Sequence, residues 1–185
     1  FYLFFEESSM NLISNIKKNS VSLGSIVKFS SGLIGKNGQD SIISDTKKGK
    51  NWLPGIISGG EINRYIINRK EKFLLHDKDF IKSGYECVKY FEDKLFLRQT
   101  GDSLICAYDT NNLLALNNIH IGNITNNKYC LKFIISVINS KLLNYYYRIT
   151  SLELGRPMAQ TDIDTIEQLP IHETNLKDQK IYSDI

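Results

Sequence analysis

The side chains that could perform catalysis are scattered along the chain. His76, His120 and His172 each lack a second metal ligand at a useful spacing, although metal ligands in proteins usually come in close groups. The glycines do not follow the order of a strand, G-x-G-x-x-G and a helix, so no dinucleotide or S-adenosylmethionine pocket is predicted. We therefore expect no catalytic residue, no metal site and no cofactor within this sequence.

The most specific enzymatic alternative is a metal-dependent nuclease. Asp77 or Asp79, together with Glu92, Asp93 and Lys94, matches the loose pattern of an acid followed by E-x-K. Such chemistry needs two carboxylates on a divalent cation and a lysine near the attacking water. Glu-x-Lys also occurs by chance in lysine-rich chains, and a solvated turn before a strand is the simpler interpretation.

Cationic and amide side chains form several groups that could bind nucleic acid. DNA binding requires cations that displace condensed counterions and polar side chains that reach base edges. The candidate DNA-binding residues are Lys36, Asn37, Gln39, Lys47, Lys48, Lys50, Arg64, Arg98, Gln99 and Arg156. Each group alone is more often a solvated surface. The net charge of +3 permits a nucleic-acid partner without indicating one.

Composition indicates one globular domain. The 185 residues, 42% of them hydrophobic, are enough for one core and short for two. Cys87, Cys106 and Cys130 are odd in number and far apart, which is typical of reduced thiols in a cytoplasmic protein. No apolar run is long enough to span a bilayer, so no membrane partner is expected. Residues 1–5 begin within an apolar segment without an initiator methionine, and we interpret the chain as part of a larger protein.

The apolar pattern predicts a β-rich middle followed by a long helix. Between residues 65 and 124, short apolar runs alternate with Gly, Asn and Asp turn signals, and residues 109–112 are a candidate hairpin turn. Apolar residues then recur at helical spacing, at Leu131, Ile134, Ile135, Ile138, Leu142 and Tyr145. We therefore predict an α+β fold in which a twisted, mostly antiparallel sheet packs on one long apolar helix, residues 131–148.

The remaining segments predict connections. Residues 1–20 pass from apolar to polar and are typical of a connector, and residues 22–27 offer an N-cap serine before a short helical turn. Residues 35–50 are rich in Gly, Asn, Ser, Asp and Lys and predict an exposed loop or hairpin. Thr161 with Asp164 resembles a capping box, and residues 173–185 predict a polar, frayed tail.

Several short motifs follow one another along the chain. They are the segment Trp52-Leu53-Pro54-Gly55-Ile56-Ile57-Ser58-Gly59-Gly60-Glu61-Ile62-Asn63-Arg64-Tyr65 (with G-x-x-I-x-x-Y), the Lys94-Leu95-Phe96-Leu97-Arg98-Gln99-Thr100-Gly101 strand, Ala107-Tyr108-Asp109, Asn117-Asn118, the apolar helix with Asn139-Ser140-Lys141 and terminal tyrosines, Leu154-Gly155-Arg156-Pro157-Met158, and Leu169-Pro170-Ile171. In this order they resemble the TaqI-like C-terminal specificity domains, which are target-recognition modules of DNA restriction-modification enzymes. The resemblance covers about residues 21–171.

The resemblance implies a DNA target-recognition domain at residues 21–172, with double-stranded DNA as its partner. It also implies that residues 1–20 lead from an N-terminal catalytic region, an adenine-N6 DNA methyltransferase of a bacterial restriction-modification system. That region would bind S-adenosylmethionine, and Mg²⁺ if an endonuclease is fused to it. The Asn- or Asp-Pro-Pro-aromatic motif of such methyltransferases is absent from this sequence. The chain itself is therefore predicted to be non-catalytic.

Two further interpretations remain open. Type I specificity subunits share an LPxP-like ending, so the chain could be one half of such a subunit. A protein-interaction scaffold that packs its tyrosine-rich helix on partner subunits is an alternative from another class.

The resemblance also divides the candidate residues by role. Positions shared by family members that read different targets cannot encode the target, so Arg98 is predicted to serve the fold or a phosphate. Residues 35–50 match the family least and can offer hydrogen bonds to base edges. Base contacts are therefore predicted for Lys36, Asn37, Gln39, Lys47 or Lys48.

Overall fold

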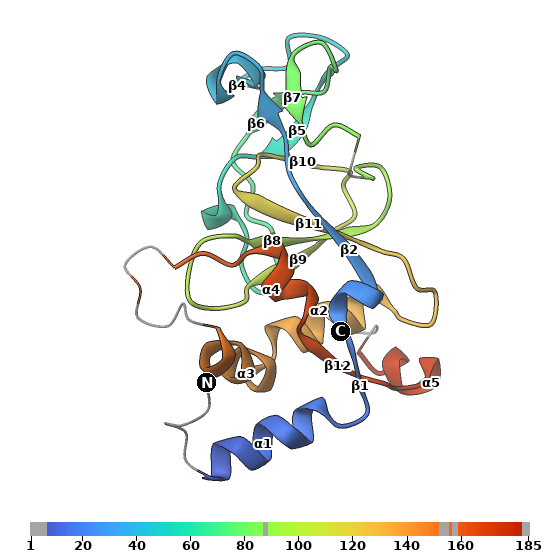
Figure 1. Cartoon of the computed structure of the whole chain (residues 1–185). Coiled ribbons are helices and arrows are strands. Elements are labelled where there is room, and N and C mark those ends of the chain that lie inside the picture. The colour runs from blue at the N-terminus through green and yellow to red at the C-terminus, as the bar shows by residue number, and fades with distance from the viewer. Residues whose placement is uncertain (1–6, 87–88, 152–155, 157–158, 183–185) are drawn as a thin grey trace.

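The structure, a computed structural model, describes residues 7–86, 89–151, 156 and 159–182. Its helices gather at one end and most of its strands at the other (Figure 1). In chain order the elements are α1 (Glu7–Lys17), β1 (Ser20–Ser22), η1 (Leu23–Ser25), β2 (Val27–Ser31), β3 (Ile34–Gly35), η2 (Gln39–Ile42), β4 (Ile43–Ser44), β5 (Trp52–Ile56), η3 (Gly59–Glu61), β6 (Lys72–Leu75), β7 (Ile81–Ser83), β8 (Lys94–Arg98), β9 (Cys106–Asp109), β10 (Leu114–Ala115), β11 (Ile119–Ile124), α2 (Leu131–Asn139), α3 (Lys141–Thr150), α4 (Ile163–Glu167), β12 (Pro170–His172) and α5 (Leu176–Lys180).

A central antiparallel sheet with the order β2-β11-β8-β9 separates two hydrophobic cores. Side chains alternate between the faces of a strand, so Leu95 and Leu97 of β8 enter the core beneath α2 and α3, whereas Phe96 enters the core on the opposite face. Residues 94–97 are all buried because both faces of the sheet are covered. This double coverage explains why residues 95–97 of β8 are a continuous apolar run.

The second core lies between the central sheet and a smaller one with the order β10-β5-β6-β4. β10 pairs with β5 in parallel, and the other pairs of this sheet are antiparallel. Two-stranded pairs, β1 with β12 and β3 with β7, complete the fold. The predicted α+β class with mostly antiparallel pairing is confirmed.

The single long helix predicted for residues 131–148 was wrong, because the segment folds as α2 and α3. Ser140 between them has an extended backbone (φ −64°, ψ 149°), and its side chain accepts a hydrogen bond from the backbone N–H of Leu143 at 3.1 Å. A serine that caps a helix in this way favours a new helix start over continuation. The break lets both helices follow the sheet, with Ile134, Ile138 and Tyr147 in one core.

Three local predictions also need correction. Residues 109–112 do not close a hairpin, because β10 pairs with β5 rather than with β9. The N-cap of α4 is Asp162, whose carboxylate accepts from Thr165 N at 2.7 Å, rather than Thr161. The predicted loop at 35–50 contains η2 and β4 and buries Ile42.

The predicted frayed tail is also ordered in part. It contains α5, and the buried Gln179 side chain accepts from Cys130 N at 2.7 Å and donates to the carbonyls of Lys128 and Thr174. These bonds attach residues 174–180 to the segment that precedes α2. The predicted turn at residues 22–27 is present as η1, and most of residues 7–20 form α1.

Candidate nucleic-acid interface

A buried carboxylate organises the loop that carries the G-x-x-I-x-x-Y motif. Glu61 is 2% exposed, and its side chain accepts hydrogen bonds from the backbone N–H groups of Ile57, Ser58 and Lys70 at 2.8–3.0 Å. Ser58 and Glu61 form a capping box around η3. One side chain therefore joins both ends of the segment 57–70.

Within that segment the chain forms a small hairpin, residues 62–67, which we call the 62–67 hairpin. Asn63 N donates to Ile66 O at 2.8 Å, Ile66 N donates back to Asn63 O at 3.2 Å, and Ile62 pairs with Ile67. Arg64 and Tyr65 occupy the turn, and Tyr65 has a left-handed backbone with φ 71°. The side chains of Arg64, Tyr65 and Ile66 are exposed at the tip.

Arg98 supports the 62–67 hairpin from the central sheet. Its Nε donates to the carbonyl of Ile62 at 2.6 Å, and an Nη donates to Asn63 Oδ1 at 3.4 Å. The Arg98 side chain also passes Gly59, where an added Cβ would lie 3.6 Å from Cγ. Arg98 therefore bonds to the hairpin, and a phosphate contact by its guanidinium stays a prediction.

The end of β8 lies beside the segment before α4. Thr100 bridges to Gln160, Thr161 N donates to Gln99 O at 2.7 Å, and Gly101 N donates to Ala159 O at 2.9 Å. The structure thus brings the Arg98 and Gln99 group next to Gln160. Arg156 is exposed, whereas its motif partners Leu154, Gly155, Pro157 and Met158 lie outside the described residues, as does Cys87.

The predicted base-reading loop lies elsewhere, at the end of the molecule where β4 and β7 are found, opposite α1 and α5 (Figure 1). Lys36 and Asn37 are exposed there. The Gln39 side chain is already used within the protein and is not free to contact a DNA base. Its amide accepts from Gly35 N and donates to Leu33 O and Asn117 Oδ1. We therefore assign Gln39 to the structure of the loop and keep Asn37 as its candidate amide for base contacts.

The three lysines that follow are exposed as well. Lys47, Lys48 and Lys50 lie between β4 and β5, and Lys48 Nζ lies 5.1 Å from the centre of the Trp52 ring. The candidate DNA-binding residues consequently form two groups. One lies on residues 36–50, and the other lies around the 62–67 hairpin, Arg98 and Gln99, while Arg156 is exposed between α3 and α4.

The nuclease pattern is not assembled as a metal site. Lys94 and Asp109 are both fully buried and form an ion pair at 2.5 Å, so Lys94 cannot approach an attacking water. Glu92 instead pairs with Lys89, and Asp93 accepts from Tyr108. Among the described residues, no three His, Cys, Asp or Glu side chains are grouped to hold a metal ion. Burial also raises the pKa of the Cys106 thiol, which disfavours the nucleophilic thiolate.

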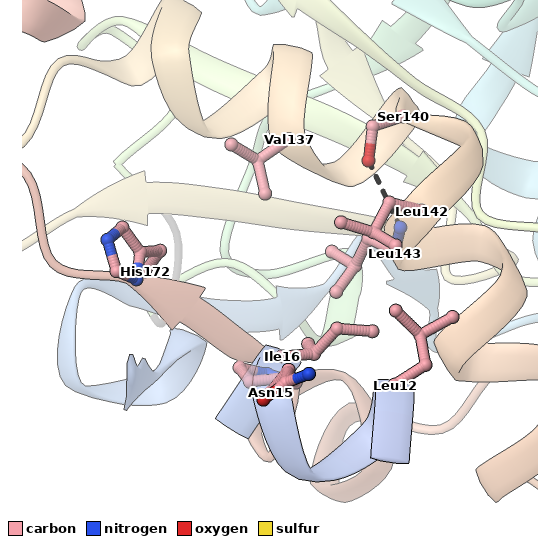
Figure 2. Close-up of a pocket in the computed structure, with 9 residues that line it drawn as sticks. Leu12, Asn15, Ile16, Val137, Ser140, Leu142, Leu143 and His172 are labelled. Atoms are coloured by element: carbon pink, nitrogen blue, oxygen red, sulfur yellow. Dashed lines mark hydrogen bonds between the residues drawn. The ribbon is translucent and has the colours of Figure 1, made fainter. Parts of the chain in front are cut away.

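Apolar grooves border the helices in the described part of the chain, and two of them contain residues of interest here. One, of about 300 Å³, lies between α1 and the α2–α3 junction and is lined by Leu12, Ile16, Val137, Leu142 and Leu143 among others (Figure 2). The other, of about 590 Å³, is lined by Tyr65, Tyr108, Lys132, Ile135, Ser136, Ser140 and Tyr182. Of the three consecutive tyrosines, Tyr146 and Tyr147 are buried, so only Tyr145 remains for an outside partner.

A buried histidine holds the segment that lies beside Gln99. His120 of β11 is 2% exposed, and its Nε2 lies 2.6 Å from the carbonyl oxygen of Thr161. Nε2 must donate this bond, and within the described residues Nδ1 has no hydrogen-bond partner. Burial lowers the pKa of His120 below the ordinary value of 6.5, although the Thr161 carbonyl and Asp162 oppose the shift.

This lowered pKa predicts acid sensitivity. The unfolded chain binds a proton near pH 6.5 that folded His120 resists, so the free energy of unfolding should be constant above that pH and fall below it. The His120→Gln variant keeps an N–H donor for Thr161 without titrating. Urea denaturation at pH values from 7.5 downwards measures the free energy of unfolding of both proteins. This free energy should fall less steeply with pH in the variant, and equal slopes for the two proteins would contradict a lowered pKa of His120. Since burial also lowers the pKa of His76, the comparison isolates His120.

Sequence reasoning missed Glu61 and Asn63 as residues that shape this surface. The S-x-x-E spacing of Ser58 and Glu61 is a capping-box signal that could have identified Glu61. No sequence signal indicates the left-handed backbone of Tyr65, because that conformation is usually found at Gly or Asn.

Comparisons with known proteins agree with this architecture. The family model of the TaqI-like C-terminal specificity domain matches residues 55–171. Among solved structures, the chain is similar to an HsdS subunit from Thermoanaerobacter tengcongensis, with a TM-score of 0.53 and 11% sequence identity over 96% of this chain and 42% of that one. It is also similar to the S subunit of a type I restriction-modification system from M. genitalium, with a TM-score of 0.51 and 13% identity over 97% of this chain and 41% of that one.

The comparisons also define the extent of the likeness. The chain spans about two fifths of the length of these two subunits, and no curated protein matches it. No helix in the described part of the chain is long and apolar enough to cross a membrane. Because the family match covers more than half of the 185 residues and runs from the last residues of β5 into β12, the chain belongs to the TaqI-like C-terminal specificity domain family.

Proposed function

We propose that the chain recognises double-stranded DNA as the target-recognition domain of a cytoplasmic bacterial restriction-modification enzyme. The family match over residues 55–171 carries this proposal. The two exposed cationic groups support it, since phosphate contacts need lysine and arginine side chains that water and DNA can reach. The chain supplies recognition, and an adenine-N6 methyltransferase region of the same protein supplies S-adenosylmethionine-dependent chemistry.

The two groups would contribute differently to recognition. Lys36 and Asn37 project from a loop whose backbone is held by Gln39, which allows them to contact base edges from a fixed support. Arg98 is used by the hairpin and would act on all sequences alike. Arg64, Lys47, Lys48, Lys50 and Arg156 are exposed and suit phosphate contacts.

The test is binding of the protein to a labelled pool of random-sequence duplexes at increasing salt, followed by sequencing of the bound fraction. We expect binding that weakens with salt, a preferred sequence that the Asn37→Ala variant relaxes at one position, and a uniform loss of affinity in Arg98→Ala. Relaxation at one base position should cost about 1–3 kcal/mol of discrimination. Salt-independent or undetectable binding would contradict DNA recognition. If Arg98→Ala changed the preferred DNA sequence and Asn37→Ala did not, the roles assigned to Arg98 and Asn37 would be reversed.

A second candidate function is one half of a type I specificity subunit. The observation that favours it is coverage, because each of the two subunits is matched over about two fifths of its length by nearly all of this chain. In either arrangement, the apolar groove between α1 and the α2–α3 junction would face the methyltransferase partner (Figure 2). Exposed Leu12 and Leu142 at this groove support a protein partner there.

A further inference from the structure

We propose that the tip of the 62–67 hairpin is a wedge that inserts into a groove of duplex DNA and holds it regardless of sequence. This inference rests on the proposed DNA recognition and adds a residue-level contact to it. The wedge consists of Tyr65 and Ile66, with Arg64 beside them to contact the backbone phosphates.

The first argument is the exposure of large apolar side chains on a rigid support. Tyr65 is 53% exposed and Ile66 is 60% exposed. The hairpin beneath them is fixed by reciprocal hydrogen bonds between Asn63 and Ile66, by Arg98 on Ile62, and by the Glu61 carboxylate. Side chains held in this way lose little conformational freedom on binding.

The second argument is the backbone of Tyr65. Its φ of 71° is unfavourable for a bulky side chain, and its N–H is held by Cys106 O at 2.9 Å. A glycine would occupy this turn without strain. Strain of this kind persists where the surrounding structure enforces it, and here its result is a half-exposed aromatic ring at the hairpin turn, where the ring also lines the groove beside Tyr108 and Ile135.

The third argument is charge. Residues 62–70 contain Arg64, Arg69 and Lys70 and no carboxylate. A basic apolar tip complements a phosphate-lined groove, and apolar wedges with neighbouring cations are the side chains that unstack and bend DNA. Because Tyr65 belongs to the motif shared with the family, its contact would be sequence-independent, unlike those of Asn37.

The test compares three variants with the unaltered protein. Tyr65→Gly removes the ring and also removes the backbone strain, so its fold should be at least as stable as that of the original. Tyr65→Phe keeps the ring, and Ile66→Ser removes the second apolar side chain. Leu176→Ser is the matched control, because Leu176 is 50% exposed but begins α5 at the helical end of the molecule.

Affinity is measured with a labelled random-sequence duplex, and base unstacking is measured by the fluorescence of 2-aminopurine within it. We expect Tyr65→Gly and Ile66→Ser to bind roughly tenfold more weakly and to lose the fluorescence increase, since a stacked base contact is of that size. Tyr65→Phe and Leu176→Ser should bind DNA and raise the 2-aminopurine fluorescence as the unaltered protein does.

The outcomes separate this inference from the proposed function. If the original protein binds DNA and all variants bind it equally well, the wedge is wrong while DNA recognition stands. The same conclusion holds if the hairpin variants bind DNA normally and instead fail to bind the methyltransferase region. If the unaltered protein binds no duplex DNA, the proposed function is wrong, and the wedge proposal is wrong with it.

Discussion

Replacing Lys94 with alanine should lower the free energy of unfolding by roughly 3–5 kcal/mol, because it leaves a buried charge without its partner. Lys94 and Asp109 are fully buried, and Lys94 Nζ also donates to Tyr90 O at 2.6 Å. Burial lowers the pKa of Lys94, while the hydrogen bond and charge of Asp109 favour the protonated form. The pair joins β8 to β9. The first residue of β9, Cys106, accepts the hydrogen bond from Tyr65 N through its carbonyl oxygen.

The exposed pair between Lys89 and Glu92 provides the matched control. Its N–O distance is 3.0 Å, and both side chains are more than half exposed. Lys89→Ala should therefore change stability by less than about 1 kcal/mol. Urea denaturation of both variants measures the difference, and similar midpoints for the two would show that the buried pair contributes no more than a surface pair.

The second large effect is expected for Asn139. Its Oδ1 accepts from Cys106 N at 3.0 Å and its Nδ2 donates to Cys106 O at 2.9 Å, so one buried amide satisfies both backbone groups of a β9 residue. Asn139→Ala leaves the Cys106 N–H buried without its partner, whereas the Cys106 carbonyl still accepts from Tyr65 N, and the cost should be about 1–3 kcal/mol. Because this amide also locks α2 to the sheet, the variant should lose protection of the β9 amides.

Ser136→Ala is the control for Asn139, since Ser136 lies on the same helix and its hydroxyl only donates to Lys132 O near the surface. Thermal unfolding and amide hydrogen exchange of the two variants provide the comparison. If Asn139→Ala unfolds at the same temperature as Ser136→Ala, other groups or water must satisfy the Cys106 backbone.

Asn139 and Ser140 also show what a motif can and cannot indicate. The Asn-Ser-Lys triplet is part of the resemblance to the family, but helical spacing predicts that all three residues lie within one helix. In the structure Asn139 bonds to the edge of β9 and Ser140 caps α3. Helical spacing predicts which face of a segment is buried, but it does not reveal that a side chain will bond to a strand 33 residues away.

The candidate site was predictable to a similar extent. Exposure of Lys36, Asn37, Lys47, Lys48 and Lys50 follows from the polar composition of their loop. The different fate of Gln39 does not, because its partner Asn117 lies far along the chain. Likewise, an E-x-K triplet cannot disclose that Lys94 is buried against Asp109.

The α+β class, the apolar strands and helices, and the family could all be predicted from the amino-acid sequence, because these depend on local periodicity and on the order of motifs. Only the three-dimensional contacts show which polar side chains support the fold and which are left exposed. Arg98, Gln39 and Lys94 turn inward because distant carbonyls, amides and carboxylates meet them there. Tyr65 and Ile66 remain outside because Glu61 and Arg98 fix the hairpin that carries them.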